Sequence, residues 1–219
     1  MDDLTRLLRH LGVDREVTLV LHDWGGMIGM AWAAQHVEAV ARVVLLNTAA
    51  FRLPSTRNFH WQLRAARDMK LGALLVRGGN AFARVAAQTC CTRNPMPSKL
   101  RDAYCAPYDS WEHRIATLRF VQDIPLSPSD PAYQIVADTE ALLPRFAHTP
   151  AMICWGQRDF VFDDHFLKVW EQTWPHAQVH RFPDCGHYIL EDAKDEVIPL
   201  VETFLRQHPL PSEVADGPR

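Results

Sequence analysis

Three side chains suited to covalent catalysis each follow a short segment that is predicted to be a strand. These segments are residues 17–21, 151–155 and 178–182. Asp23 follows the first, Asp159 the second and His187 the third. An aspartate is ionised at neutral pH, so it can attack carbon without a base to activate it. A histidine oriented by a second carboxylate can carry charge or a proton at neutral pH. The set predicts Asp23 as nucleophile, His187 as its partner and Asp159 as the orienting acid.

The residues around Asp23 predict a sharp turn from a strand into a helix. Residues 17–21, Val-Thr-Leu-Val-Leu, are mostly apolar, as in a strand buried on both faces, and a helix of small residues is expected over 27–35. Gly25 and Gly26 permit the backbone crowding of such a turn. The turn lifts Asp23 clear of the sheet and directs backbone N–H groups of the helix towards it. Taken alone, the motif fits a helix-capping aspartate equally well.

Strand and helix patterns alternate at both ends of the chain. A helix over 4–11 and strands over 17–21 and 43–46 are expected first, and strands over 151–155 and 178–182 alternate with helices later. Residues 51–146 carry helical patterns and many prolines but no buried strand. The sequence predicts an α/β fold with four parallel strands. Its core would be residues 1–50 and 147–208, with a helical cap insertion at 51–146 and a flexible tail at 209–219.

Other residues near the predicted site offer alternatives. Asp163 and Asp164 lie further into the loop of Asp159 and are the rival acids. Cys185, two residues before His187, is expected to be a small buried residue, because nothing nearby indicates a lowered thiol pKa.

Two features near these residues concern ligands. The indole N–H of Trp24 is an uncharged donor suited to holding a halide or a carboxylate oxygen beside Asp23, and the same residue can also pack under the insertion. His176 and His180 are four apart, but the segment runs into a strand, which separates the two side chains. We expect no metal and no organic cofactor.

Composition narrows the remaining classes. The chain has 219 residues, 47% hydrophobic, 22% charged and a net charge of −3, which is typical of one globular domain with room for an inserted subdomain. No run of one charge sign indicates nucleic acid or an anionic membrane as a partner. The apolar runs are too short to span a bilayer, and the acidic start does not resemble a signal peptide. Five cysteines, an odd number, favour free thiols and a cytoplasmic location.

Together the motifs resemble the haloalkane dehalogenase branch of the α/β-hydrolases. The order nucleophile, acid, histidine is the one those proteins use. The motifs are His22-Asp23-Trp24-Gly25-Gly26 with Asn47-Thr48, Trp155-Gly156-x-x-Asp159, and Gly186-His187-Tyr188-x-x-Glu191-Asp192. Within that branch, residues 103–111 and 119–128 are very similar to bacterial olefin-biosynthesis β-lactone decarboxylases.

The resemblance implies conversion of a small apolar substrate, a cis-3,4-dialkyl-oxetan-2-one, to a cis-alkene and carbon dioxide. It also implies a complex with thiolase-like and β-lactone-forming partners. The alternatives are a haloalkane dehalogenase, an epoxide hydrolase with Tyr104 and Tyr108 as acidic donors, and an inactive remnant. In this fold an oxyanion loop and further strands precede the nucleophile, so Asp23 at this position leads us to expect an N-terminally truncated protein. The chain alone is expected to be poorly soluble and inactive.

Overall fold

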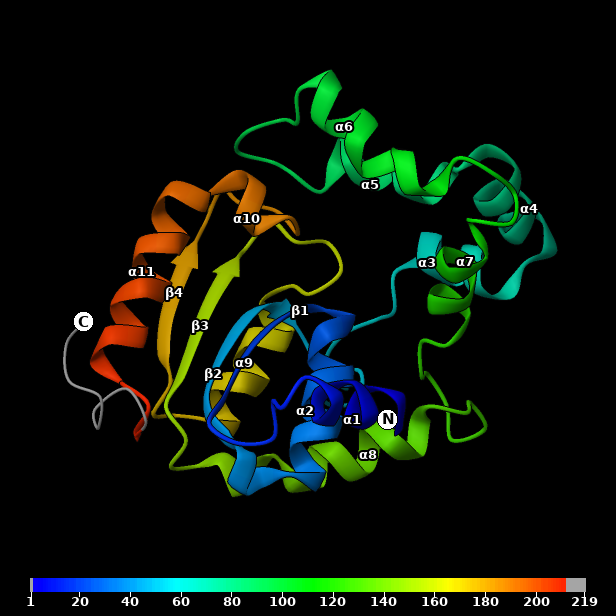
Figure 1. Cartoon of the computed structure of the whole chain (residues 1–219). Coiled ribbons are helices and arrows are strands. Elements are labelled where there is room, and N and C mark those ends of the chain that lie inside the picture. Colours follow the sequence, from blue (N-terminus) through cyan, green and yellow to red (C-terminus); the bar gives the residue numbers. More distant parts are fainter. Residues whose placement is uncertain (1, 212–219) are drawn as a thin grey trace.

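The computed structural model describes residues 2–211 and contains a sheet of four parallel strands in the order β1-β2-β3-β4 (Figure 1). The strands are β1 Val17–Asp23, β2 Val40–Thr48, β3 Ala151–Gly156 and β4 Gln178–Phe182. Leu45 of β2 pairs with Leu21 of β1 on one side and with Ile153 of β3 on the other. The predicted α/β fold with four parallel strands is therefore confirmed.

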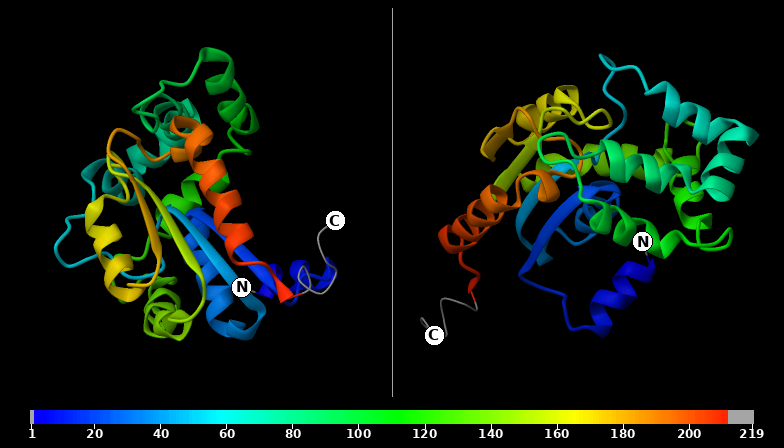
Figure 2. Two further views of the ribbon diagram at one scale, coloured as in Figure 1. Left: turned by 90° about the vertical axis from the view of Figure 1, so that its left-hand side faces the viewer. Right: turned by 90° about the horizontal axis from the view of Figure 1, so that it is seen from above.

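Helices cover both faces of the sheet, as apolar strands flanked by crossover helices require. On one face lie α2 (Trp24–Gln35), α8 (Tyr133–Leu142) and α9 (Asp164–Thr173), and on the other lies α11 (Lys194–Gln207) (Figures 1 and 2). The other elements of this region are α1 Asp2–His10, η1 Val37–Ala39 and α10 Ile189–Asp192. Alternate residues of β2 and β3 serve the two faces: Val43, Leu45 and Ile153 face α2 and α9, whereas Val44 and Met152 face α11.

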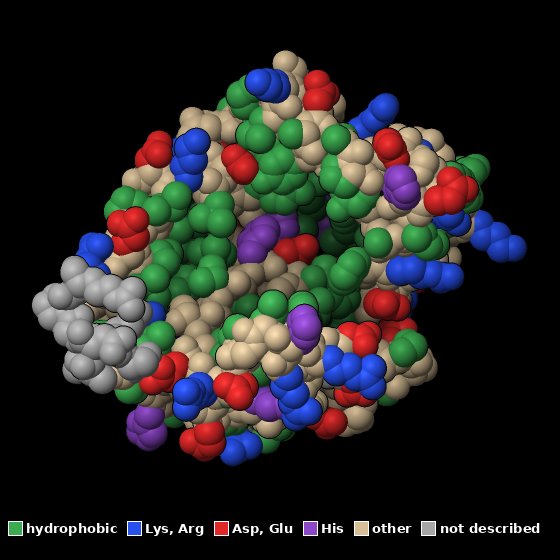
Figure 3. Space-filling model, viewed as in Figure 1, with side chains coloured by type: hydrophobic (Ala, Val, Ile, Leu, Met, Phe, Trp, Pro, Cys, Tyr) green, Lys and Arg blue, Asp and Glu red, His purple; other side chains and the backbone are tan. Residues whose placement is uncertain are grey.

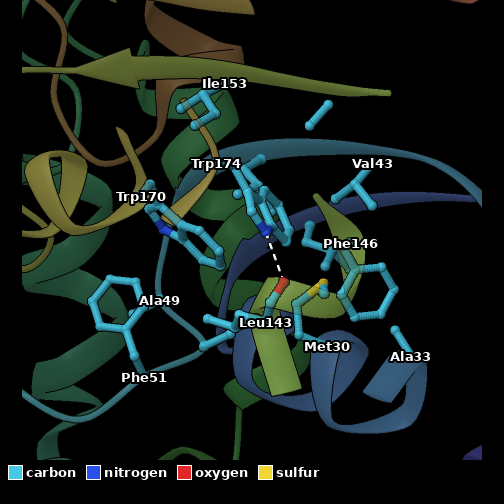
Figure 4. Packing of buried hydrophobic residues seen from close by; sticks show 14 of the residues in the cluster. Met30, Ala33, Val43, Ala49, Phe51, Leu143, Phe146, Ile153, Trp170 and Trp174 are labelled. Carbon is cyan, nitrogen blue, oxygen red and sulfur yellow. Dashed lines mark hydrogen bonds between the residues drawn. The ribbon is translucent and has the colours of Figure 1, made fainter. Parts of the chain in front are cut away.

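The larger core is built around two tryptophans of the α9 region (Figure 4). Trp170 donates its indole N–H to the carbonyl of Thr48 at 2.8 Å, and Trp174 donates to the carbonyl of Leu143 at 3.0 Å. Both rings are buried, and each polar N–H is satisfied, so these side chains fill the core without an unpaired donor. The bond to Thr48 fixes α9 at the carboxyl end of β2, close to the predicted site.

Every regular element between β2 and β3 is helical. These elements are α3 Trp61–Asp68, α4 Lys70–Gly79, α5 Ala81–Thr89, α6 Ser98–Cys105, η2 Ala106–Tyr108, α7 Ile115–Gln122, α8 and η3 Leu143–Phe146. Helices α3 to α7 gather beyond the carboxyl ends of the strands, whereas α8 packs on α2 and η3 contributes Leu143 and Phe146 to the core (Figure 1). The division into core and cap at residues 51 and 146 stays a prediction. Residues 212–219 of the predicted tail lie outside the described residues.

Candidate active site

Asp23 occupies the turn between β1 and α2. Its φ of 50° and ψ of −124° lie outside the regions that residues with a Cβ commonly adopt, so the backbone is strained there. The carboxylate makes no capping hydrogen bond to α2, and the side chain is 43% exposed. The geometry is thus that of a side chain displayed above the sheet, and the helix-capping interpretation is wrong.

The end of β2 holds this turn in place. The Thr48 hydroxyl donates to the carbonyl of Asp23 and accepts from the backbone N–H of Gly26 at 3.0 Å. A Cβ on Gly26 would lie 2.0 Å from Thr48 Oγ1 and 2.6 Å from the carbonyl oxygen of Ala49. Only glycine therefore allows α2 to begin so close to β2. A Cβ on Gly25 would meet nothing closer than 4.0 Å, so the two glycines that the sequence presents as equivalent are not.

The structure brings His187 and Asp159 together. His187 Nδ1 lies 2.7 Å from Asp159 Oδ2, and Asp159 Oδ1 accepts the backbone N–H of Val161 at 2.7 Å. The Asp159 carboxylate is fully buried. His187 Nε2 faces Asp23 at 3.9 Å from its Oδ1. The three predicted residues therefore meet in the predicted order, acid to histidine to aspartate.

Charge at this site favours a protonated imidazole. Burial alone lowers the pKa of His187, but the carboxylate of Asp159, which also accepts its N–H, and the charge of Asp23 outweigh burial and raise that pKa. Asp159 thus fixes both the orientation and the charge of the ring, as the orienting acid of a triad does.

The rival acids have other partners. Asp163 caps α9 by accepting the backbone N–H of His165 at 3.0 Å, and it pairs with Arg57 at 2.6 Å. Asp164 accepts the side-chain amide of Gln157 at 3.0 Å. Among the described residues, neither is hydrogen bonded to the imidazole of His187. Of the three loop carboxylates, only Asp159 makes such a bond.

Cys185 is a buried free thiol. Burial first, and then Asp192 and other nearby acids, raise its pKa to about 12 despite Arg93, which acts in the opposite direction. The thiol is therefore protonated at neutral pH, as expected of a packing residue rather than a nucleophile.

His22 is a contact of His187 that sequence reasoning did not assign. Its Nε2 lies 2.8 Å from the backbone oxygen of His187, and the two ring centroids are 4.6 Å apart. Burial first, and then the nearby charge of His187, lower the pKa of His22, so it is the neutral member of the pair and donates to that carbonyl. The position of His22 directly before Asp23 was the only sequence signal for this contact.

Asp192 holds the loop that carries His187. Its Oδ2 accepts the N–H of Gly186 at 2.7 Å and of Thr92 at 2.9 Å, and its Oδ1 accepts the N–H of Arg93 at 3.1 Å and of Asn94 at 2.9 Å. A buried carboxylate with four donors is well compensated for the loss of water. This residue joins the insertion to the histidine loop.

An apolar pocket that is partly open to solvent lies beside Asp23 and Trp24. Its walls come from α2, the start of the insertion, the loop after α7 and the loop before α9. They are Met27, Phe51, Leu53, Arg57, Phe59, His60, Leu63, Ile124, Pro125, Leu126, Val161, Phe162 and Phe166. Figure 3 shows histidine and acidic side chains in a hollow between apolar walls on this face. The ring of Trp24 lies 5.4 Å from that of Phe120 of α7, and its predicted donor role stays a prediction.

Within residues 2–211, no three His, Cys, Asp or Glu side chains are grouped as ligands for a metal ion. His176 instead bonds the backbone of Thr149 at 2.9 Å, and His180 lies in β4. In the same part of the chain, no helix is both long and apolar enough to cross a bilayer.

The family model for the alpha/beta hydrolase fold matches residues 1–194. The chain is an α/β-hydrolase. This α/β-hydrolase is 55% identical, over 94% of its length, to a cis-3-alkyl-4-alkyloxetan-2-one decarboxylase of Shewanella oneidensis, of which it covers 65%. It is 47% identical to a protein of the same name from Xanthomonas campestris pv. campestris, over 96% of this chain and 70% of that one. A haloalkane dehalogenase of Mycobacterium marinum is 29% identical over 83% of this chain and 59% of its own length.

Solved structures agree on the fold of this α/β-hydrolase. Haloalkane dehalogenase DbeA from Bradyrhizobium elkani matches with a TM-score of 0.83 and 22% identity, over 93% of this chain and 71% of that one. A putative ancestral haloalkane dehalogenase matches with a TM-score of 0.84 and 20% identity, over 93% and 72%. The predicted resemblance to this branch and to the lactone decarboxylases is confirmed. The chain spans about two thirds of the length of the curated decarboxylases that it matches.

Proposed function

We propose that this chain carries the catalytic residues of a β-lactone decarboxylase that acts on cis-3,4-dialkyl-oxetan-2-ones. The observation that carries the substrate class is the 55% identity, over 94% of this chain, to a protein named for that activity. The apolar pocket beside Asp23 supports it, because a lactone with two alkyl chains needs a largely apolar site.

In the proposed reaction, a carboxylate oxygen of Asp23 attacks ring carbon C4. The C4–O bond breaks, and its electrons leave a carboxylate on C3. The C3–carboxylate bond then supplies the electrons of the C3=C4 double bond, carbon dioxide departs, and the C4–O bond to Asp23 breaks. Attack inverts the configuration at C4. Carbon dioxide and the Asp23 carboxylate then depart from opposite sides of the C3–C4 bond, which keeps the two alkyl groups on the same side, so a cis-lactone gives a cis-alkene. The sequence consumes no water, proton or cofactor.

His187 and Asp159 would act by charge in this reaction. An imidazolium whose Nε2 faces Asp23 at 3.9 Å stabilises the carboxylate that attacks and later leaves. The buried carboxylate of Asp159 keeps that imidazolium charged and correctly turned. We propose that Trp24 holds a carboxylate oxygen of the substrate from the edge of the pocket. Thiolase-like and β-lactone-forming partners, and a cytoplasmic location, remain proposals that follow from the resemblance.

The test uses the protein expressed from the whole reading frame that encodes this chain. A synthetic cis-3,4-dialkyl-oxetan-2-one is supplied, and the cis-alkene is measured by gas chromatography. Asp23→Asn keeps the shape but loses the nucleophile, so turnover should fall by about 10³-fold or more. Asp164→Asn is the matched control: it neutralises an acid at the start of α9 that accepts the side-chain amide of Gln157, and it should keep turnover within about threefold. Alkene formation by Asp23→Asn at the wild-type rate would refute the assignment, and no alkene from any form would favour an inactive remnant.

Haloalkane dehalogenation is the second candidate, because the same imidazole could activate a water between itself and Asp23. His187→Ala separates the two reactions. A dehalogenase without its base accumulates an alkyl ester on Asp23, which intact-mass measurement detects after incubation with a 1-haloalkane. A lactone decarboxylase needs no hydrolytic water, so we expect no such adduct. An adduct in stoichiometric yield would favour the dehalogenase.

A further inference from the structure

Helix α4 turns an apolar face outwards. Leu71, Leu74 and Leu75 follow the i, i+3, i+4 spacing of one helix face and are 59%, 55% and 52% exposed. Another face of α4 packs against the rest of the insertion: Val76 is buried, and a Cβ on Gly72 would lie 2.4 Å from the carbonyl oxygen of Ala65 in α3. The three leucines are therefore exposed although α4 is packed against its neighbours. This is unusual, because the surface of a packed helix that faces water is normally polar.

Neighbouring residues extend this surface. Trp61 and Met69 at the two ends of α3, and Val85 of α5, are also exposed large apolar side chains. We call the exposed residues of α3, α4 and α5 the outer cap face. Figure 1 places α3 and α4 at the end of the insertion that lies away from the sheet, and α5 runs from α4 back towards the loop of His187. Several exposed apolar side chains on helices that contact one another are typical of an interaction surface.

The same segment is basic, although the whole chain has a net charge of −3. Residues 61–89 contain five basic side chains and one acidic one, Asp68. Arg67 pairs with Asp68 and with Asp130, and Arg77 lies over the ring of Trp111 at 4.2 Å. The other three are exposed and, among the described residues, have no acidic partner: Arg64, Lys70 and Arg84.

We propose that the outer cap face docks on an anionic lipid surface. Apolar side chains interleaved with unpaired Lys and Arg match the layered chemistry of such a surface, in which headgroup charge lies above acyl chains. An acidic protein would satisfy the basic side chains but not require the aliphatic stripe between them. The net charge of the whole chain gave no indication of an anionic membrane partner. All acidic residues except Asp68 lie outside residues 61–89, so the whole-chain charge does not reflect the basic character of this segment.

Docking would also place the site next to its substrate. Leu63 of α3 lines the pocket of Asp23, so one of the three helices that carry the outer cap face also forms part of a wall of that pocket. A dialkyl lactone dissolves in lipid, and an opening beside α3 would receive it directly from the bilayer. This access route rests on the proposed function, whereas lipid binding does not.

Co-sedimentation with vesicles tests the proposal without substrate, so its outcome is independent of turnover. The protein expressed from its whole reading frame is mixed with vesicles of phosphatidylcholine alone or of phosphatidylcholine and phosphatidylglycerol in equal parts. Leu71→Ser/Leu74→Ser/Leu75→Ser removes the stripe, and Arg64→Glu/Lys70→Glu/Arg84→Glu reverses the charge. The matched control is Leu11→Ser/Ile135→Ser/Ile198→Ser, three residues that are about as exposed but lie outside α3–α5. Far-UV circular dichroism checks that each variant is folded.

We expect binding to the anionic vesicles, weakened by salt, and little binding to phosphatidylcholine alone. A basic residue near such a surface contributes roughly fivefold in partitioning, so charge reversal should lower binding by about 100-fold or more. The serine variant should lose at least about tenfold, and the control should bind as wild type. Equal loss in the control, equal binding to both vesicles, or no binding at all would overturn the proposal. The proposal would also be overturned if the protein did not bind vesicles but self-associated, and if the serine variant abolished that self-association. The outer cap face would then contact a second copy of the chain.

Discussion

Alanine substitutions at the two adjacent glycines that follow Asp23 and Trp24, Gly25 and Gly26, should have different effects on stability. Alanine at Gly26 places a methyl group 2.0 Å from Thr48 Oγ1 and 2.6 Å from the carbonyl oxygen of Ala49. The Ala49 oxygen is a backbone atom, so it cannot move away by a side-chain rotation. Alanine at Gly25 meets nothing closer than 4.0 Å. The first substitution must displace α2 from β2, whereas the second adds a methyl group to an open position in a helix.

The magnitudes follow from these contacts. Overpacking of a rigid site costs about 1–3 kcal/mol. Displacement also breaks the two hydrogen bonds of the Thr48 hydroxyl, to Gly26 and to Asp23, at about 1 kcal/mol each. Gly26→Ala should therefore lower the free energy of unfolding by about 3–5 kcal/mol, which lowers Tm by about 6–20 °C for a domain of this size. Gly25→Ala should be neutral or stabilising by up to about 1 kcal/mol, because alanine favours helix over glycine.

Thermal unfolding followed by circular dichroism measures both variants, and urea unfolding supplies the free energies. Thr48→Ala combined with Gly26→Ala gives a double-mutant cycle. Removal of the hydroxyl relieves the contact at 2.0 Å but not that with Ala49, so the double variant should be less destabilised than the sum of the two single changes. Equal stability of Gly25→Ala and Gly26→Ala would show that the start of α2 is not held against β2 as described.

Three further predictions concern the surroundings of the site. Asp159→Asn removes the carboxylate that raises the pKa of His187, so the lowering effect of burial on that pKa should dominate. The midpoint of His187, measured by NMR titration, should shift from above the ordinary value of 6.5 to below it. Wild-type stability includes a contribution from His187 that is full below pH 6.5 and is lost as pH rises through the raised pKa, and this part of the pH dependence should reverse sign in the variant. A midpoint unmoved by Asp159→Asn would contradict the role of that acid. His22→Phe keeps a ring beside His187 but removes the 2.8 Å bond to its carbonyl, so kcat should fall by about tenfold or more with KM little changed, and a change in KM alone would exclude a positioning role. Asp192→Asn replaces an acceptor oxygen with an amide N–H₂, which cannot accept the bonds of two of the four backbone N–H groups. The free energy of unfolding, measured in urea, should fall by about 2–4 kcal/mol, whereas Asp195→Asn at an exposed position should change it by less than about 0.5 kcal/mol.

Residues 17–21 were expected to be buried on both faces, but Val20 of β1 is 54% exposed, so that part of the prediction was wrong. Strands β2 and β3 were predictable because their interiors are apolar on both faces, which is a local property. The boundaries of β2 were not. The prediction began at residue 43, but β2 begins at Val40 and includes the buried Arg42. Arg42 is accommodated because its Nε donates to Thr18 Oγ1 at 2.7 Å and its Nη1 to the carbonyl of Leu205 at 3.0 Å. A charged residue that relies on partners 24 and 163 positions away carries no local strand signal.

The same distinction applies to the site. Asp23, Asp159 and His187 were predictable because each follows a strand, and the carboxyl ends of parallel strands meet at one edge. The choice of Asp159 over Asp163 required only its closeness to the strand end. The roles of His22 and Asp192 depend on contacts across 165 and up to 100 residues, so their sequence positions identify them only as members of a motif. Their physical function becomes readable once the loops are folded together.

The four bonds accepted by Asp192 give the insertion a fixed pivot. Residues 92–94 are clamped to the loop of His187, and the N–H of Tyr188 adds a bond to the carbonyl of Cys90 at 2.9 Å. Helices α3–α5 precede this pivot in the chain and α6–α7 follow it, so substitutions on their far faces leave the bonds that hold the imidazole intact. Evolution could vary which substrates the helices admit, and which surface they meet, without readjusting the distance between His187 and Asp23.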